Sequence, residues 1–161
     1  MNALELAIEM EREGRQYYLD QAEINKDNEL SKVFLLLADS EKEHEDLLRK
    51  RLNKEEYAFK EDQSFISIKS VFNGLKEYEA SDIRKASQLD VYRLALDIEE
   101  KSIDHYQKML EDATEDKDKE LFKFLIKEEK QHMNLFDKLV EMLTRPDEWV
   151  ESPEFGLRED Y

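Results

Sequence analysis

Residues 119–143 read KELFKFLIKEEKQHMNLFDKLVEML, and this stretch decides the fold class. Its apolar side chains recur every three or four positions, which is typical of a helix with one buried face. Glu129 and His132 fall inside that apolar stripe, where burying a charged group is costly unless another group compensates it. The stretch therefore predicts a buried helix that carries a Glu-x-x-His motif on its inner face.

Three other stretches have the same helical period, so we expect four helices. The expected helices cover residues 2–25, 28–52, 88–113 and 119–143. Short polar loops at Asn25–Asn28 and Thr114–Asp118 join the helices in pairs, whereas residues 53–87 form a connection long enough to cross the whole bundle. The sequence thus predicts an all-α fold, an antiparallel four-helix bundle made of two hairpins joined by a long crossover.

Gly and Pro are rare, which favours long helices over short strands. The chain of 161 residues has three Gly and two Pro, and both Pro lie after residue 145. We expect one domain over residues 1–143 and an extended, aromatic-anchored tail over residues 144–161. Apolar residues with helical spacing at positions 65–78 of the crossover favour core packing, although a partner surface is the alternative.

The composition excludes several function classes. Forty-one acidic residues against 25 basic ones give a net charge of −16, which disfavours binding to nucleic acid or to an anionic membrane. The absence of Cys excludes disulfides, thiolate metal sites and iron–sulfur centres on these residues. Because the N-terminus is acidic and no apolar run approaches ~18 residues, we expect a cytoplasmic protein without a membrane span.

The two hairpins match each other at a constant offset of 88 residues, without a gap. The matched pairs are Leu6 and Leu94, Ala7 and Ala95, Glu11 and Glu99, Tyr18 and Tyr106, Phe34 and Phe122, Leu37 and Leu125, Glu41 and Glu129, His44 and His132, and Leu47 and Leu135. Each Glu-x-x-His motif alone is a weak signal, but a single register that carries every matched acid and His is a strong one.

Six of these matched residues are candidate metal ligands. They are Glu11, Glu41, His44, Glu99, Glu129 and His132. Four carboxylates facing one another would repel by about 4 kcal/mol per pair at ~4 Å and an effective dielectric constant near 20, so two divalent cations would relieve them. Oxygen and imidazole donors suit iron or manganese, and a Glu from two helices with Glu-x-x-His from two others is the ligand set of di-iron bundles. The alternative is that these residues form ion pairs with Lys and Arg, or lie outside because the helix phase is misplaced.

Three other residues near the motifs have different expected roles. Tyr18 and Tyr106 follow their Glu by seven positions, almost two turns and ~10 Å along the helix, so they suit hydrogen bonding to ligands better than ligation. They are the candidate catalytic residues. His105 lies about 120° around the helix from Glu99, so we expect it to be a surface residue or a residue of the layer behind the ligands, and not a ligand.

With these motifs in place, residues 3–143 resemble the rubrerythrin-like branch of the ferritin-like di-iron carboxylate superfamily. The resemblance implies specific roles: terminal ligands Glu11 and Glu99, bridging ligands Glu41 and Glu129, and His44 and His132 each on one iron. Peroxide-reducing members typically carry another Glu three residues after the third-helix ligand, where this chain has Ser102, matched by Gly14. These two small residues either leave room for an oxidant or permit close helix packing.

The resemblance implies a non-haem di-iron oxidoreductase that reduces hydrogen peroxide or dioxygen, with a role in oxidative stress. Such members also carry a rubredoxin domain, which a chain without Cys cannot provide, so the electrons would come from an external donor such as a rubredoxin-like protein. We expect two iron ions, with manganese or a mixed pair as the alternative, in a homodimer. The competing functions are iron oxidation or storage and, further away, a metal-free helical interaction module.

Overall fold

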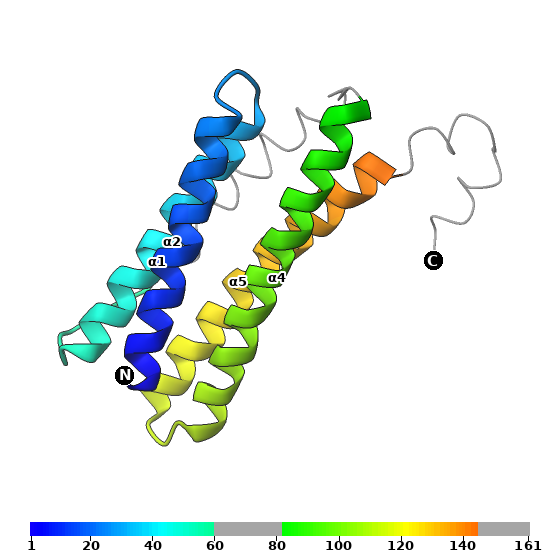
Figure 1. Cartoon of the computed structure of the whole chain (residues 1–161). Helices are drawn as coiled ribbons and strands as arrows, with labels where there is room; N and C mark the ends of the chain where they lie inside the picture. The colour runs from blue at the N-terminus through cyan, green and yellow to red at the C-terminus, as the bar shows by residue number, and fades with distance from the viewer. Residues whose placement is uncertain (60–81, 145–161) are drawn as a thin grey trace.

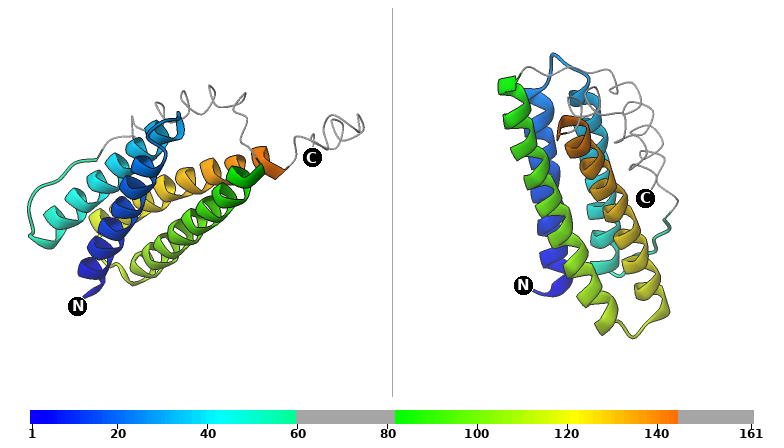
Figure 2. Two further views of the ribbon diagram at one scale, coloured as in Figure 1. Left: turned by 45° about the horizontal axis from the view of Figure 1, so that its top comes forward. Right: turned by 90° about the vertical axis from the view of Figure 1, so that its right-hand side faces the viewer.

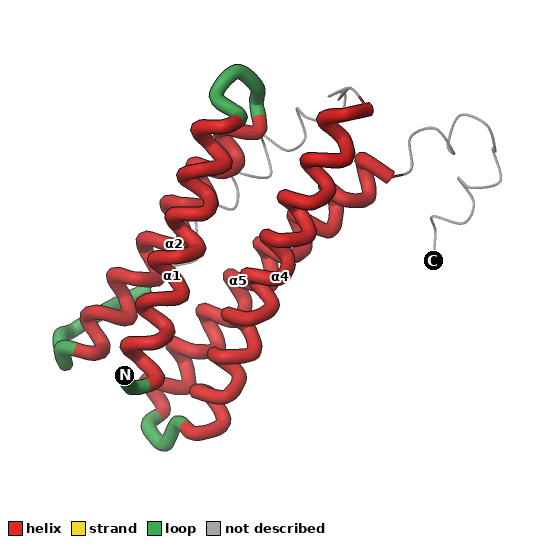
Figure 3. Tube along the Cα trace, viewed as in Figure 1, coloured by secondary structure: helices red, strands yellow, loops and turns green. Residues whose placement is uncertain are grey.

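The computed structural model describes residues 1–59 and 82–144, and these residues form four helices and no strand. The helices are α1 (Ala3–Ile24), α2 (Leu30–Leu52), α4 (Asp82–Asp112) and α5 (Asp116–Thr144), as Figure 1 and Figure 3 show. The all-α four-helix prediction is therefore confirmed. Among the helices described, none is long and apolar enough to cross a membrane. The apolar residues expected at 65–78 and the tail after residue 144 lie outside the described residues.

The helices form two antiparallel hairpins, α1 with α2 and α4 with α5. The end of α2 and the start of α4 lie at opposite ends of the bundle (Figure 1). As a result α1 and α4 run in opposite directions, as the two views of Figure 2 also show. This is the helix order expected from the sequence.

Two helix boundaries differ from the predicted ones by more than two residues. Helix α4 starts at Asp82 rather than near residue 88, because the apolar stripe that placed it begins later than the helix, and residues 82–87 contain no Gly or Pro to stop it. Helix α5 starts at Asp116, inside the predicted loop, where Asp116 and Asp118 in the first turn complement the positive end of the helix dipole.

Local hydrogen bonds fix where the first hairpin begins and turns. Asn2 and Glu5 form a capping box at the start of α1, in which the Asn2 side chain accepts from the Glu5 backbone N–H at 2.8 Å. At the start of α2, the Asn28 side chain accepts from the Leu30 N–H at 2.8 Å. At the other end, Arg51 of α2 donates two hydrogen bonds to Asp118 of α5, which ties the two hairpins together.

The core consists of two apolar layers with a polar layer between them. The first apolar layer, named here the Phe136 layer, contains Tyr18, Ala22, Leu30, Val33, Phe34, Leu37, Ala38, Tyr92, Ala95, Leu135, Phe136 and Leu139. The second, the Leu121 layer, contains Ala7, Ile8, Leu48, Ile103, Tyr106, Met109, Leu121, Phe122, Leu125 and Ile126. On every helix the candidate ligands stand between the residues of these two layers, so both layers shield them from water.

Candidate metal centre

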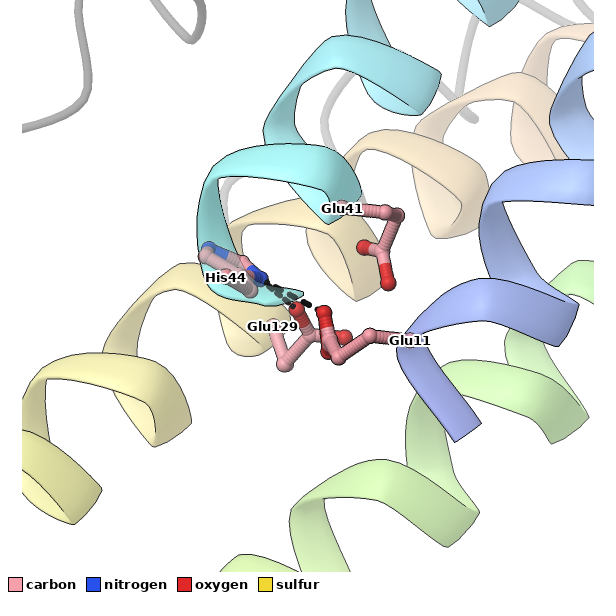
Figure 4. Close-up of side chains that lie close together, drawn as sticks. All are labelled: Glu11, Glu41, His44 and Glu129. Carbon is pink, nitrogen blue, oxygen red and sulfur yellow. Dashed lines mark hydrogen bonds and ion pairs between the residues drawn. The ribbon is translucent and has the colours of Figure 1, made fainter. Parts of the chain in front are cut away.

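The polar middle layer brings together all six residues that the sequence proposed as ligands. None of them is more than 1% exposed, so the expected helix phase is correct for each helix. One acid comes from each of the four helices, and the two His come from α2 and α5. Figure 4 shows Glu11, Glu41, His44 and Glu129 converging from α1, α2 and α5.

These side chains form two overlapping groups, and each group could hold a metal ion. In each group the potential ligand atoms lie within 4.8 Å of one another. The members of the first group are Glu11, Glu41, His44 and Glu129, and those of the second are Glu41, Glu99, Glu129 and His132. Because Glu41 and Glu129 occur in both, the arrangement can hold two cations that share two carboxylates.

Both imidazole rings point the same nitrogen at the carboxylates. Nδ1 of His44 lies 2.8 Å from Oε1 of Glu129 and 3.1 Å from Oε2 of Glu11. Nδ1 of His132 lies 3.1 Å from Oε1 of Glu41 and 3.4 Å from Oε1 of Glu99. Nδ1 is therefore the nitrogen available to a metal in both rings, and Nε2 faces away from the centre.

The outward nitrogens bind residues that sequence analysis missed. Nε2 of His44 lies 3.1 Å from Oε1 of Glu128, and Nε2 of His132 lies 3.1 Å from Oγ of Ser40. Glu128 and Ser40 are buried, and each comes from the helix opposite the His that it contacts. The 88-residue register could have drawn attention to them, because Ser40 and Glu128 occupy matching positions just before the shared Glu.

The two Tyr bind acids across the bundle rather than those on their own helix. The Tyr18 hydroxyl donates to Oε1 of Glu99, and the Tyr106 hydroxyl donates to Oε1 of Glu11 at 3.0 Å. Because α1 and α4 are antiparallel, a residue two turns beyond one Glu lies level with the Glu of the other helix. Both Tyr therefore form hydrogen bonds to candidate ligands, as expected, but each binds the Glu of the other hairpin.

Burial and mutual repulsion govern the protonation of the shared acids. The pKa values of Glu41 and Glu129 are raised well above the usual value, first by burial and then by the charges of neighbouring carboxylates such as Glu99. Burial alone would also raise the pKa of Glu99, but the charge of His132 and hydrogen bonds that include one from Tyr18 lower it instead. The two acids that both groups share therefore take up a proton more readily than an ordinary carboxyl group does.

Burial shifts the pKa of a histidine in the opposite direction to that of a carboxyl group. Burial would lower the pKa of His132, but Glu99 and Glu41 outweigh it and raise the pKa to about 10. For His44 burial is likewise overcome, by Glu11 and by hydrogen bonds that include the one to Glu128, so its pKa is raised well above the usual value. Protons on these rings take the place that a metal cation would occupy.

Several buried atoms in this layer lack a hydrogen-bond partner among the described residues. They are Oε1 of Glu41, Oε2 of Glu99, both carboxylate oxygens of Glu129 and Nδ1 of His132. Some lie within ion-pair distance of each other, such as Nδ1 of His132 and Oε1 of Glu41 at 3.1 Å. Orphaned oxygen and imidazole donors that converge on one place fit iron or manganese, so the residues present suit a di-metal centre.

The small residues one turn from the terminal acids pack closely. A Cβ atom added at Gly14 would lie 3.2 Å from Oε2 of Glu41, so the space beside Gly14 is used by a shared carboxylate. This favours the close-packing explanation of Gly14 over a cavity for an oxidant. Ser102, the matching residue on α4, is also buried. His105 lies outside both groups, and its Nε2–H donates to the Ala3 carbonyl at 3.0 Å.

A ferritin-like four-helix bundle whose buried middle layer can hold metal is the class of protein that this fold and site define. The family model of rubrerythrin matches residues 2–140, so the chain belongs to the rubrerythrin family. Rubrerythrins typically bind iron, and the resemblance seen in the sequence is confirmed. No curated protein and no solved structure shows significant similarity to the chain.

Proposed function

We propose that this protein is a non-haem di-iron oxidoreductase that reduces hydrogen peroxide or dioxygen with electrons from an external donor. One observation carries the proposal: two groups of buried ligand atoms that share Glu41 and Glu129. Family membership supports iron as the metal. Manganese or a mixed pair satisfies the same donors.

The proposed ligand roles follow the membership of the two groups. Glu41 and Glu129 belong to both, so we assign them as bridging ligands, and Glu11 and Glu99 belong to one each, so we assign them as terminal ligands. His44 and His132 would each bind one iron through Nδ1, the nitrogen that faces the carboxylates.

Two ferrous ions held here would supply the two electrons that convert hydrogen peroxide and two protons into two water molecules. The chain itself orients and shields. Tyr18 and Tyr106 retain their protons at physiological pH, because burial, followed by the charges of Glu99 and Glu11, raises their pKa values well above the usual value. Their hydroxyls hold the terminal carboxylates in place, and the two apolar layers exclude water.

The donor that returns the electrons is proposed to be a separate protein or module of the rubredoxin type. These 161 residues contain no Cys, so a thiolate-bound electron-transfer centre would have to lie elsewhere. We further propose that the protein works as a cytoplasmic homodimer.

The second candidate function is iron oxidation for sequestration, with ferrous iron as the substrate. Ser102 favours it, because this residue is buried at the position where peroxide-reducing relatives are expected to carry an additional carboxylate. Light scattering separates a storage protein from the first proposal: we expect a dimer, and an assembly of about two dozen chains would instead indicate a storage cage.

Stopped-flow oxidation of the anaerobic, ferrous-loaded protein tests the main proposal. Peroxide and dioxygen are mixed in parallel with wild type and with Glu129→Ala, which removes a carboxylate common to both groups. We expect faster oxidation by peroxide in wild type and loss of the fast phase in the variant. Equal or faster oxidation by dioxygen would replace peroxidase with oxidase or ferroxidase activity, and a fast phase that survives in the variant would refute the site.

A further inference from the structure

The two candidate metal positions differ at one buried contact that the duplication does not preserve. Ser40 and Glu128 are matched by the 88-residue register, and each lies four residues before the His of its own helix. Each reaches the Nε2 atom of the His on the opposite helix at 3.1 Å. The two rings therefore have the same orientation and the same contact distance, but one meets a carboxylate and the other a hydroxyl.

The carboxylate is the stronger acceptor. When Nδ1 binds a metal, Nε2 carries the ring proton and donates a hydrogen bond. An anionic acceptor of this hydrogen bond makes the ring a better electron donor to the metal than a neutral acceptor does. Glu128 is 3% exposed and His44 is 1% exposed, so water does not screen the pair strongly. The rings of Phe124 and His44 pack in a T-shaped arrangement and Phe59 stacks on Phe124, which covers this side further.

The charge around the two positions is unequal for the same reason. The group around His44 contains three carboxylates, and Glu128 adds a fourth just behind the ring. The group around His132 also contains three carboxylates, but the residue behind that ring is the uncharged Ser40. A cation is therefore attracted more strongly to the His44 position.

We propose that Glu128 makes the two metal positions unequal, so that the position at His44 binds its divalent ion more tightly and fills first. Glu128 acts as a positioning and affinity-setting residue behind His44, and Ser40 leaves the His132 position weaker. The inference rests on the proposed di-metal ligand set. Removal of a partner behind a ligating His typically lowers metal affinity about 10- to 100-fold, which sets the size of the expected difference.

Anaerobic titration of the metal-free protein with cobalt(II), followed by calorimetry and by visible absorption, tests the inference without any turnover. Wild type is expected to bind two ions in two resolved steps. Glu128→Gln keeps an oxygen that can accept from Nε2 but removes the charge, so it should weaken the tighter step about 10- to 100-fold and bring the two steps together. Ser40→Glu should strengthen the weaker step and also bring the steps together.

Glu45→Gln is the matched control. Glu45 is a buried acid beside His44 in the sequence, but its carboxylate pairs with Arg49 and not with a His. Removing the charge of Glu45 should leave the affinities of both cobalt-binding steps within about twofold of wild type. An effect equal to that of Glu128→Gln would show that buried charge in general, and not the contact to His44, sets the affinity. Circular dichroism checks that each variant is folded, and Ser40→Glu decides the matter if Glu128→Gln does not fold.

Two results would overturn the inference in distinguishable ways. Two equal cobalt steps in wild type, or a Glu128→Gln variant that weakens only the second step, would refute the inequality and leave the di-metal site intact. No cobalt binding in wild type, or binding that Glu129→Ala does not change, would refute the ligand set and with it the proposed function.

Discussion

The polar middle layer and the Phe136 layer are equally well buried, yet they stabilise the protein in different ways. In the Phe136 layer the rings of Tyr18, Phe34 and Phe136 stack with centroids 5.8–6.3 Å apart, and this contact stabilises the fold without any metal. In the middle layer burial, followed by the charges of neighbouring carboxylates, raises the pKa values of Glu41 and Glu129, so these acids disfavour their charged form unless a cation neutralises it. Stability should therefore have one part that is independent of metal and another that depends on it.

The largest expected effect lies in the apolar layer. Phe136→Ala should lower the free energy of unfolding by about 3–5 kcal/mol, because Phe136 is fully buried against the rings of Tyr18, Phe34 and Tyr92 and its removal leaves a cavity. The loss should be similar in the metal-free and the metal-loaded protein, as measured by urea denaturation. Leu35→Ala, at a residue 48% exposed, should change little. A loss of stability seen only in the metal-free or only in the metal-loaded protein would contradict the proposed division into a metal-independent and a metal-dependent part.

The next largest effect arises in the middle layer and depends on bound metal. Divalent iron or manganese at about 100 times its dissociation constant should raise the free energy of unfolding by about 2.7 kcal/mol for each ion bound. Glu129→Ala should abolish this increment, because both groups lose a ligand, whereas Glu100→Ala on the exposed side of α4 should retain it. Thermal melts with and without metal measure both, and an undiminished increment in Glu129→Ala would contradict the assignment.

The pH dependence should distinguish the layers as well. Because the folded pKa of His132 is raised to about 10, its contribution to stability is complete below about pH 6.5 and declines as pH rises toward 10. The raised pKa values of Glu41 and Glu129 act in the same direction. The metal-free protein should lose about 2 kcal/mol between pH 6.5 and 8, at 1.36 kcal/mol per pH unit for one proton.

The lowered pKa of Glu99 acts only near and below its usual value of 4.5, outside this range. Metal replaces the protons, so the stability increment from metal should grow over the same range. Urea denaturation at several pH values, with and without metal, measures both trends. Stability of the metal-free protein that rises with pH would contradict the protonated middle layer.

The smallest effect is expected where the Phe136 layer meets the polar middle layer. Tyr18→Phe removes the hydrogen bond to Glu99 but keeps the stacked ring, so it should cost about 1.5 kcal/mol in the metal-free protein. Tyr106→Phe should cost a similar amount through Glu11, because the contact is the matching one on the other hairpin. Urea denaturation of both variants sharpens the comparison, since a cost in only one would show that the hairpins differ here too.

The sequence alone determined which face of each helix is buried and which positions of the two hairpins match. Helical period is a local property, so the apolar stripes placed Glu11, Glu41 and Glu129 correctly on the inner faces, and the 88-residue register paired the hairpins. The start of α4 at Asp82 was missed, because a helix can extend beyond its apolar stripe when nothing in the sequence stops it.

Only the tertiary structure decided which side chains contact each other across the bundle. Two features depend on how far one hairpin is shifted and rotated against the other. They are the hydrogen bond from Tyr18 to Glu99 of the other hairpin, and the contacts that Glu128 and Ser40 make behind the two His. That geometry comes from the packing of the two apolar layers, and no spacing within one helix encodes it. The same packing places Glu41 and Glu129 in both groups of potential ligands.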